Sequence, residues 1–458
     1  MAHTRAGGLK DRFNEENKFS NKKGMIKMST INIGLVGAGT VGGGVIRVLD
    51  KRLGYFKSEL DLDLKLSRVV DKDLERFTRL PAGGAVCSSD VNDILNDESI
   101  SVVVELVGGT GFARAFVLDA LKRGKHVVTA NKALIAQHGP EIFEAAAVNN
   151  VSLYFEASVG GGIPVIKSIR ESLVGNDIFS VRTIINGTCN YILSRMTAQG
   201  LPFADVLKQA QEKGYAEADP ALDIEGGDTG HKAAILASLV SGSYVSYGNF
   251  PVEGITHISK DDIEFAKELG YTIKLLGIIK KNNGGLDVRV HPAMLPAGHI
   301  LASVSDVYNA VLLEGDAVGQ ILLYGRGAGE LPTASAVVSD IIDVVRNITG
   351  NSPVRVPMDY YRSGKQINMI PVEKIESRYY LRFTVSDNPG VLASIANHLG
   401  SEGISIASVM QKEKSGGSGV PVIFITHNAS EKGIQNALGK IEKEKYARAA
   451  TQLIRIEE

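Results

Sequence analysis

Residues 213–232, in the middle of the chain, carry the residue types best suited to catalysis. Their sequence, KGYAEADPALDIEGGDTGHK, is dense in carboxylates and ends in a lysine. A helix that begins near Asp228 would place Asp228 and Lys232 at positions i and i+4, side by side on one face. A solvated turn with an ordinary helical ion pair is one interpretation. The paired glycines at 226–227 and the very apolar helix that follows favour a functional site instead.

A glycine-rich turn near the start of the chain predicts a nucleotide site. The apolar run 31–36 leads directly into Gly37-Ala38-Gly39-Thr40-Val41-Gly42, and apolar residues at helical spacing follow. Between a strand and a helix, this GxGxxG pattern gives a tight turn, close approach to a pyrophosphate and close helix packing. The helix N-terminus then offers N–H groups to the phosphates. A glycine-rich turn without a ligand is the alternative.

The second expected strand, 65–70, ends at Asp71 and Lys72. An acidic residue at this position usually accepts hydrogen bonds from the adenosine ribose and favours NAD. Asp71 lies further from the glycine turn than the usual spacing of about 20 residues. We interpret residues 55–63 as an insertion that lengthens this interval. Lys72 could bind the 2′-phosphate of NADP, although a plain turn lysine is the simpler interpretation. The cofactor is therefore NAD or NADP.

Strand, helix and strand alternate over 101–107, 112–123 and 125–130, which predicts parallel βαβ units. Ligands of such sheets bind beyond the carboxyl ends of the strands. We therefore expect the nicotinamide half of the cofactor to face Val107, Gly108, Asn131 and Lys132.

The remaining patterns predict an α/β and α+β multidomain protein. A Rossmann-type nucleotide domain is expected over 31–155, completed by a helix that returns at about 330–350. An α+β domain with a mostly antiparallel sheet, for substrate and dimerisation, is expected over 156–329. A linker at 351–377 leads to a module at 378–458 whose βαββαβ order is ferredoxin-like. Residues 1–30 are polar and are interpreted as a disordered extension rather than a secretory signal.

Composition excludes several classes of function. A formal net charge of −1 gives no basic footprint for nucleic acid. No apolar run is long enough to span a membrane. Two cysteines without a partnering pattern argue against a disulfide framework and a cysteine zinc site, and they fit a cytoplasmic protein.

Several of these motifs resemble those of homoserine dehydrogenases. The resemblance rests on GYAEADP with the Asp, Gly, Asp and Lys that follow it, on NGTCNYIL at 186–193, on TANK at 129–132 and on GRGAG at 325–329 before PTASAV. DNPGVL at 387–392 resembles the start of an ACT domain, a small module that binds amino acids. Together these motifs cover most of the chain from about residue 31 onward.

The resemblance implies reversible hydride transfer between NAD(P)H and the aldehyde carbon of L-aspartate 4-semialdehyde, giving L-homoserine in threonine, methionine and isoleucine biosynthesis. Lys232 is the expected general acid. Lys132 would place a second ammonium group near the same oxygen, and Asp228 would hold Lys232.

Substrate and cofactor contacts are expected along the same motifs. Glu217 and Asp223 are candidates to accept hydrogen bonds from the α-ammonium group, with Asp219 a weaker one. Gly187 and Thr188, at a helix start, would seat the carboxylate. The remaining candidates are Tyr215 for substrate, and Gly214, Glu217 and Gly327 for the cofactor.

The family also carries a structural monovalent cation, usually Na⁺, at a segment that matches 156–163. By that resemblance the ligands would be backbone oxygens of Glu156, Val159, Gly161 and Ile163. In the ACT-like module an amino-acid effector, threonine by family expectation, would dock near Asn388, Gly390 and Val391. A dimerisation module without a ligand is the alternative. A homodimer or homotetramer is expected.

Two other functions were weighed. An aspartate-semialdehyde dehydrogenase needs a thiolate, and Cys189 at a helix start is the only plausible nucleophile. A non-catalytic sensor of nucleotides and amino acids would explain the ACT-like module. It would have no need of the proton donor that Lys132, Asp228 and Lys232 suggest.

Overall fold

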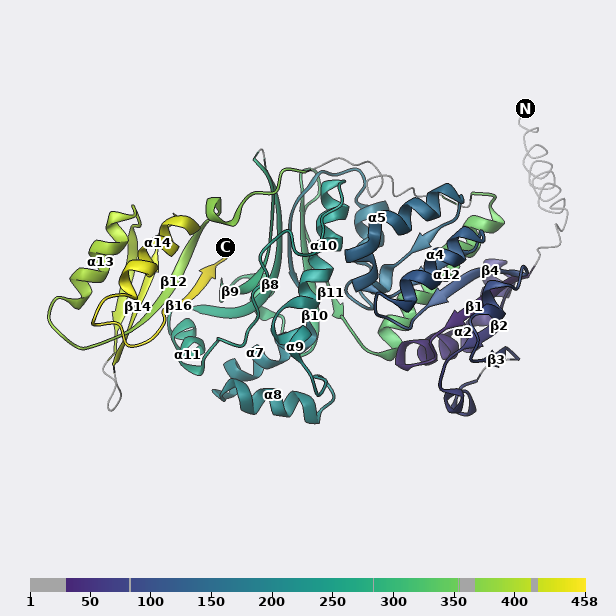
Figure 1. The fold of residues 1–458 in the computed structure, drawn as a ribbon, viewed down its shortest axis with the longest axis horizontal. Coiled ribbons are helices and arrows are strands. Elements are labelled where there is room, and N and C mark those ends of the chain that lie inside the picture. Colours follow the sequence, from purple (N-terminus) through teal and green to yellow (C-terminus); the bar gives the residue numbers. More distant parts are fainter. Residues whose placement is uncertain (1–29, 82–83, 283, 353, 355–366, 413–418) are drawn as a thin grey trace, which may run out of the picture.

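A computed structural model describes residues 30–81, 84–282, 284–352, 354, 367–412 and 419–458. Its parts follow one another along the longest axis (Figure 1). The N-terminal parallel sheet lies at one end, a larger sheet with its helices lies in the centre, and a small α/β part lies at the other end. The C-terminal strand runs back toward the centre (Figure 1). None of the described helices is long and apolar enough to cross a membrane.

The N-terminal part is a parallel six-stranded sheet in the order β3-β2-β1-β4-β5-β6. This is the strand order of a Rossmann fold, so the predicted fold class is confirmed. The central strands are almost wholly buried because helices cover both faces. The strands are β1 (Ile31–Val36), β2 (Leu64–Val70), β3 (Val86–Ser88), β4 (Ile100–Glu105), β5 (His126–Thr129) and β6 (Leu153–Tyr154). The helices are α2 (Thr40–Leu60), η1 (Leu74–Arg79), α3 (Asn92–Leu95), α4 (Phe112–Lys122) and α5 (Lys132–Val148).

The residues interpreted as an insertion are mostly helical. Helix α2 continues to Leu60 and ends at Asp61, whose φ of 53° is left-handed. The longer gap between the glycine turn and Asp71 therefore reflects a longer helix. Its apolar face packs against α12 (Glu330–Thr349) from much later in the chain. The packing is close, since a Cβ atom on Gly44 would lie 2.9 Å from the Glu330 carbonyl oxygen.

The central sheet is mostly antiparallel, as predicted. It begins in the order β11-β10-β7-β8-β9, and every one of these pairs is antiparallel. Its strands are β7 (Ile178–Ile184), β8 (Tyr271–Asn282), β9 (Gly285–Pro296), β10 (Tyr308–Gly315) and β11 (Gly319–Arg326). The elements around it are η2 (Glu156–Ser158), α6 (Val165–Lys167), η3 (Ser168–Ser172), α7 (Gly187–Gln199), α8 (Phe203–Glu212), α9 (Ala221–Ile224), α10 (Gly227–Ser241), α11 (Lys260–Glu268) and η4 (Ile300–Ser303).

The C-terminal part has the predicted βαββαβ order. It is built from η6 (Val372–Lys374), β12 (Glu376–Val385), α13 (Val391–Ser401), β13 (Ile406–Gln411), β14 (Val420–Thr426), β15 (Ala429–Ser430), α14 (Glu431–Ile441) and β16 (Gln452–Ile456). Its second strand, β13, begins at Ile406, since Ile404 packs into the core after the helix.

The last strand joins two parts of the molecule in a way that the sequence does not indicate. Strand β16 pairs with β12 on one side and, in parallel, with β9 on the other. The central and C-terminal sheets thereby form one continuous ten-stranded sheet. Of the expected linker at 351–377, residues 353 and 355–366 lie outside the described residues, and so does the expected N-terminal extension except for Thr30.

Candidate active site

A cavity of 600 Å³ lies between the parallel sheet and the central sheet and brings many predicted site residues together. Helices α5 and α10 pack against each other beside it. The predicted residues that line it are Val41, Lys132, Gly161, Gly187, Thr188, Gly214, Tyr215, Glu217, Asp223, Asp228, Lys232 and Gly327. They come from segments that are up to 286 residues apart (41 to 327), so only the folded chain assembles this site.

Asp228 lies between two lysines in the wall of this cavity. It occupies the first turn of α10, where its Oδ2 accepts a hydrogen bond from Lys232 Nζ at 2.6 Å. Its Oδ1 lies 3.3 Å from Lys132 Nζ, at the start of α5. Lys232 Nζ also donates to the Ile185 carbonyl oxygen at 2.7 Å. The helix expected at Asp228 thus forms, and it pairs Asp228 with Lys232.

The charge of Asp228 is stabilised by these lysines. Burial alone would raise its pKa, but the Lys232 and Lys132 ammonium groups lower the pKa to about 2. The Asp228 and Lys232 side chains are only 7% and 11% exposed, whereas Lys132 is 33% exposed. Asp228 is therefore ionised at neutral pH and holds both ammonium groups at the cavity.

A second group of polar residues adjoins this ion pair. Asn186 caps α7, and its Nδ2 donates to Asp223 Oδ1 at 2.7 Å and to Asp228 Oδ2 at 2.9 Å. Thr188 Oγ1 donates to the Tyr215 carbonyl oxygen at 2.6 Å. Burial raises the pKa of Asp223. The Asn-Gly-Thr turn and the motif at 213–228 thus form one hydrogen-bonded network.

The glycine turn after β1 is closely packed. A Cβ atom on Gly42 would lie 1.9 Å from the Gly37 carbonyl oxygen, and Gly37 has a φ of 96°. Only glycine fits either position without strain. Asp71 braces the turn, since its Oδ2 accepts a hydrogen bond from the Ala38 amide at 2.6 Å.

Two expected cofactor residues, Val107 and Gly108, lie near β4 but do not line the cavity. Their amides donate to Glu105 Oε1 at 2.8 and 2.9 Å, and the Val107 residue is 48% exposed. Lys72 is exposed and lines neither this cavity nor the one described next.

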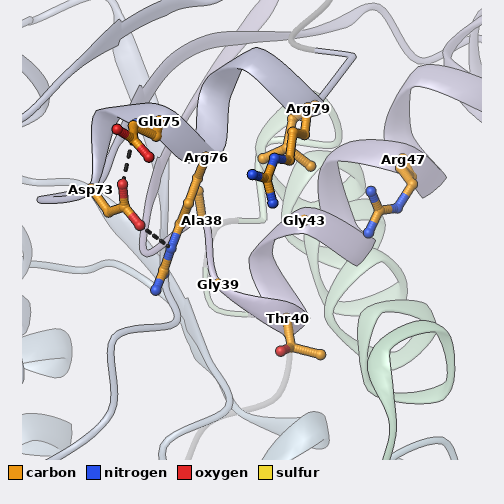
Figure 2. Close-up of a pocket in the computed structure, with 10 residues that line it drawn as sticks. Ala38, Gly39, Thr40, Gly43, Arg47, Asp73, Glu75, Arg76 and Arg79 are labelled. Atoms are coloured by element: carbon orange, nitrogen blue, oxygen red, sulfur yellow. Dashed lines mark hydrogen bonds and ion pairs between the residues drawn. The ribbon is translucent and has the colours of Figure 1, made fainter.

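A smaller cavity of 370 Å³ lies on the outer side of the glycine turn (Figure 2). Ala38, Gly39 and Thr40 form one wall. Three arginines that sequence reasoning missed, Arg47, Arg76 and Arg79, also line it. Arg76 and Arg79 belong to the short helix η1, which carries no recognisable motif, and Arg47 lies in α2 between apolar residues.

Sequence reasoning also missed Asn309 and Arg326 at the main cavity. They lie on β10 and β11, near the glycine-rich loop 325–329. That loop is tightly packed, because a Cβ atom on Gly327 would lie 1.7 Å from Asn309 Nδ2. The glycine-rich loop could have drawn attention to Arg326, which lies within it. Asn309 has no distinctive sequence context.

The expected cation segment turns sharply after η2. Gly160 and Gly161 have φ values of 76° and 55°, both left-handed. Among the residues that the structure describes, nothing donates a hydrogen bond to the carbonyl oxygens of Val159 and Gly161. The described residues contain no group of three or more His, Cys, Asp or Glu side chains that could hold a metal ion. Any ion here would therefore depend on backbone oxygens.

Of the three expected effector residues, Asn388 and Gly390 lie in the exposed turn between β12 and α13, and Val391 is the buried first residue of α13. The Asn388 amide donates to the Ser386 carbonyl oxygen at 3.0 Å, and Gly390 caps α13 with a φ of 90°. The Val391 amide, the first of α13, donates to the Asn388 carbonyl oxygen at 3.4 Å.

Cys189 does not have the surroundings of a nucleophile. Burial, together with Asp223 and Asp228, raises the pKa of its thiol well above the ordinary value. Its Sγ lies 3.2 Å from the Asp223 carbonyl oxygen, as a donor. A reactive cysteine needs a lowered pKa, so this geometry opposes thioester chemistry.

Known proteins resemble this chain over most of its length. Family models match as "Homoserine dehydrogenase, NAD binding domain" at 37–156, "Homoserine dehydrogenase" at 164–342 and "ACT domain" at 379–445. A homoserine dehydrogenase of Neisseria gonorrhoeae is 43% identical, over 94% of this chain and 99% of that relative. The chain belongs to the homoserine dehydrogenase family. A relative from Pseudomonas aeruginosa is also 43% identical, over 94% of this chain and 100% of its own length.

Solved structures agree with this assignment. A homoserine dehydrogenase from Thiobacillus denitrificans has a TM-score of 0.89 and 42% identity, covering 94% of this chain and 99% of its own. A hyperthermophilic archaeal homoserine dehydrogenase in complex with NADPH has a TM-score of 0.58 and 26% identity, covering 69% of this chain and 97% of its own. This homoserine dehydrogenase is thus an NAD(P)-dependent oxidoreductase that acts on a CH–OH group, and it carries an ACT domain.

Proposed function

We propose that Lys232 is the proton donor when this enzyme reduces L-aspartate 4-semialdehyde to L-homoserine. The observation that carries the proposal is the placement of its ammonium group. Two of its three N–H bonds are directed to Asp228 Oδ2 and the Ile185 carbonyl oxygen. The third is left for a substrate oxygen in the cavity that Lys232 lines.

The chemistry requires a proton and a positive charge at the same oxygen. The nicotinamide supplies the hydride to the aldehyde carbon. As the carbonyl becomes an alcohol, its oxygen gains negative charge, which Lys232 neutralises by donating a proton. Lys132, on the other side of Asp228, stabilises the developing charge. In the oxidative direction, Lys232 takes the proton back.

The charged ends of the substrate have different partners among the residues that line the cavity. Glu217 and Asp223 accept hydrogen bonds from the α-ammonium group, with Asp223 oriented by Asn186. Gly187 and Thr188 begin α7, whose free amides and partial positive charge suit a carboxylate. Tyr215, which packs on Tyr191 at 5.1 Å between ring centroids, covers the substrate. Gly214 and Gly327 border the nicotinamide ribose.

We also propose a structural monovalent cation beside this cavity. The supporting feature is the turn at Gly160 and Gly161, which leaves the Val159 and Gly161 carbonyl oxygens without hydrogen-bond donors among the described residues. The carbonyl oxygens of Glu156 and Ile163 each accept one backbone hydrogen bond and keep a second acceptor position. Oxygen ligands of this kind suit a hard cation such as Na⁺.

The ACT domain suggests regulation by an amino acid. We propose that this amino acid is threonine and that it binds near Asn388, Gly390 and Val391. We also propose that the enzyme is a homodimer or homotetramer and that its reaction serves threonine, methionine and isoleucine biosynthesis. The exposed turn at Asn388 and Gly390, directly before the N-terminus of α13, supports a carboxylate site at this turn.

The test is the nicotinamide absorbance of purified enzyme mixed with L-homoserine and either cofactor, with and without L-threonine. We expect reduction of the cofactor, and inhibition by threonine that deletion of residues 378–458 abolishes. Cys189→Ser should leave the rate within about twofold, because the buried thiol takes no part. Activity that depends on phosphate and on Cys189, with none toward homoserine, would replace this proposal with thioester chemistry.

A further inference from the structure

The small cavity outside the glycine turn contains a pair of guanidinium groups on one short helix. Arg76 and Arg79 stand three residues apart in η1, and residues three apart lie on the same face of a 3₁₀ helix. Both line the cavity together with Ala38, Gly39 and Thr40 (Figure 2). Arg76 borders the glycine turn closely, since a Cβ atom on Gly39 would lie 3.3 Å from its Nη1.

Asp71, the residue that would mark an NAD enzyme, is already engaged. Its Oδ2 accepts hydrogen bonds from the Ala38 amide at 2.6 Å and from Arg76 Nη1 at 3.2 Å, and its Oδ1 accepts one from the Asp73 amide at 2.9 Å. A carboxylate has about four acceptor positions, and these bonds occupy three of them. The Asp71 side chain is only 8% exposed. The Asp71 carboxylate therefore has too few free acceptor positions to bind both hydroxyl groups of an NAD ribose.

Asp73 and Arg47 in this cavity also have partners, whereas the Glu75 carboxylate, which lines the cavity too, is exposed. Asp73 Oδ1 caps η1 through the Glu75 amide, and its Oδ2 accepts from Arg76 Nε at 3.2 Å. Arg47 is bound through two nitrogens to Glu330 on α12. Arg79 forms no ion pair with any described residue and is exposed. Arg76 keeps N–H groups beyond the two used by Asp71 and Asp73. Arg76 and Arg79 therefore offer unpaired guanidinium N–H groups to a ligand in this cavity. The neighbouring Asp71 carboxylate already accepts three hydrogen bonds.

We propose that Arg76 and Arg79 bind the 2′-phosphate of NADP(H) and make NADPH, rather than NADH, the preferred cofactor. Guanidinium groups suit a phosphate because their planar donors match its oxygens. Asp73 orients Arg76 for this contact. The proposal deepens the proposed function, because it names the cofactor that serves the same active site.

Binding of nucleotide fragments tests the proposal without any turnover. Calorimetry would measure 2′,5′-ADP and 5′-AMP on the wild type, Arg76→Ala, Arg79→Ala and a matched control, Lys65→Ala, an exposed cation at the far end of β2. The wild type should bind 2′,5′-ADP about 10- to 100-fold more tightly than 5′-AMP, as expected for charge-assisted hydrogen bonds. Each arginine variant should lose about tenfold toward 2′,5′-ADP and little toward 5′-AMP. Equal binding of the two fragments by the wild type would overturn the proposal.

Steady-state kinetics then connects this site to the reaction. Arg79→Ala should raise KM for NADPH about tenfold while kcat and the KM for NADH stay nearly unchanged. Two further variants represent the competing assignments. Lower NADPH affinity in Lys72→Ala, with none lost in Arg79→Ala, would contradict the assignment of Arg76 and Arg79 to the 2′-phosphate. The same assignment would be wrong if the enzyme preferred NADH and Asp73→Asn raised KM for NADH. An enzyme inactive on homoserine that still prefers 2′,5′-ADP would contradict the proposed function and leave this inference standing.

Discussion

At the scale of single residues, two neighbouring carboxylates have different surroundings and therefore different expected roles. Asp228 contacts two lysines, which lower its pKa to about 2. Asp223 has no ammonium group in hydrogen-bond contact among the described residues, and burial raises its pKa. Asp228 holds the two lysines that we propose for catalysis, whereas Asp223 is the carboxylate that we propose for the cationic end of the substrate. The two share Asn186 as a hydrogen-bond donor.

This difference predicts opposite kinetic signatures for two matched substitutions. Asp228→Asn should lower kcat about 100-fold with a small change in homoserine KM, because Lys232 and Lys132 lose the charge that positions them. Asp223→Asn should mainly raise homoserine KM, because the neutral amide binds the α-ammonium group poorly. Steady-state kinetics at saturating cofactor would separate the effects. The same signature for both variants would contradict the division of roles.

Residue patterns predicted part of this site and missed the rest for physical reasons. The Asp228 and Lys232 pair follows from helical spacing, and the glycine turn follows from its strand and helix. Arg76 was missed because its role depends on how η1 folds back over Gly39. Asn309 was missed because only the pairing of β10 and β11 carries it to the cavity.

At the scale of elements, the sequence predicts the parallel sheet and the βαββαβ part well, since both have clear alternation of apolar strands and helices. The sequence does not predict that the central and C-terminal sheets join through β16 and β9. The contact of β16 with β9 involves two short strand segments, Arg455–Ile456 and Ala293–Met294, whose pairing depends on the placement of whole domains. The extent of α2 was also missed, because Gly54 is a residue type that commonly ends a helix, whereas α2 continues through it to Leu60.

Strand β5, which leads to Lys132, begins with a buried histidine that predicts a pH-dependent stability. Burial lowers the pKa of His126 from about 6.5 to about 4. The unfolded chain therefore binds the proton first on acidification, and the free energy of unfolding falls between about pH 6.5 and 4. Wild-type protein should lose up to about 3 kcal/mol more than His126→Gln over this range. Denaturant titrations at several pH values check this, and parallel pH profiles for the two proteins would contradict it.

At the scale of the whole molecule, the last strand connects the ACT domain to the catalytic part by charge as well as by backbone pairing. Arg455 on β16 binds Glu431 through two nitrogens, at 2.9 and 2.8 Å, and Glu253 at 2.9 Å. Glu253 belongs to a segment that contacts the motif loop, since the Ile255 amide donates to the Ile224 carbonyl oxygen at 2.8 Å. The C-terminal strand is therefore connected, through Glu253 and the Ile255–Ile224 hydrogen bond, to the segment that carries Asp223.

Removing Arg455 should destabilise the protein strongly. Arg455→Met leaves the Glu431 carboxylate buried without its cation, which costs about 3–5 kcal/mol. Adding Glu431→Gln should recover part of the loss, because the uncompensated charge is then gone. Thermal unfolding of the single and double variants measures both effects. A double variant less stable than Arg455→Met would show that buried charge is not the cause.

The central claim of this account is that Lys232 donates the proton, and single-turnover kinetics tests it most directly. Wild type, Lys232→Ala and Lys132→Ala would each be preloaded with the reduced cofactor and mixed with aspartate semialdehyde, and nicotinamide absorbance followed. We predict that Lys232→Ala binds both ligands within about threefold of the wild type but oxidises the cofactor at least about 1,000-fold more slowly, with a smaller loss for Lys132→Ala. A normal single-turnover rate for Lys232→Ala, with normal substrate affinity, would contradict the claim.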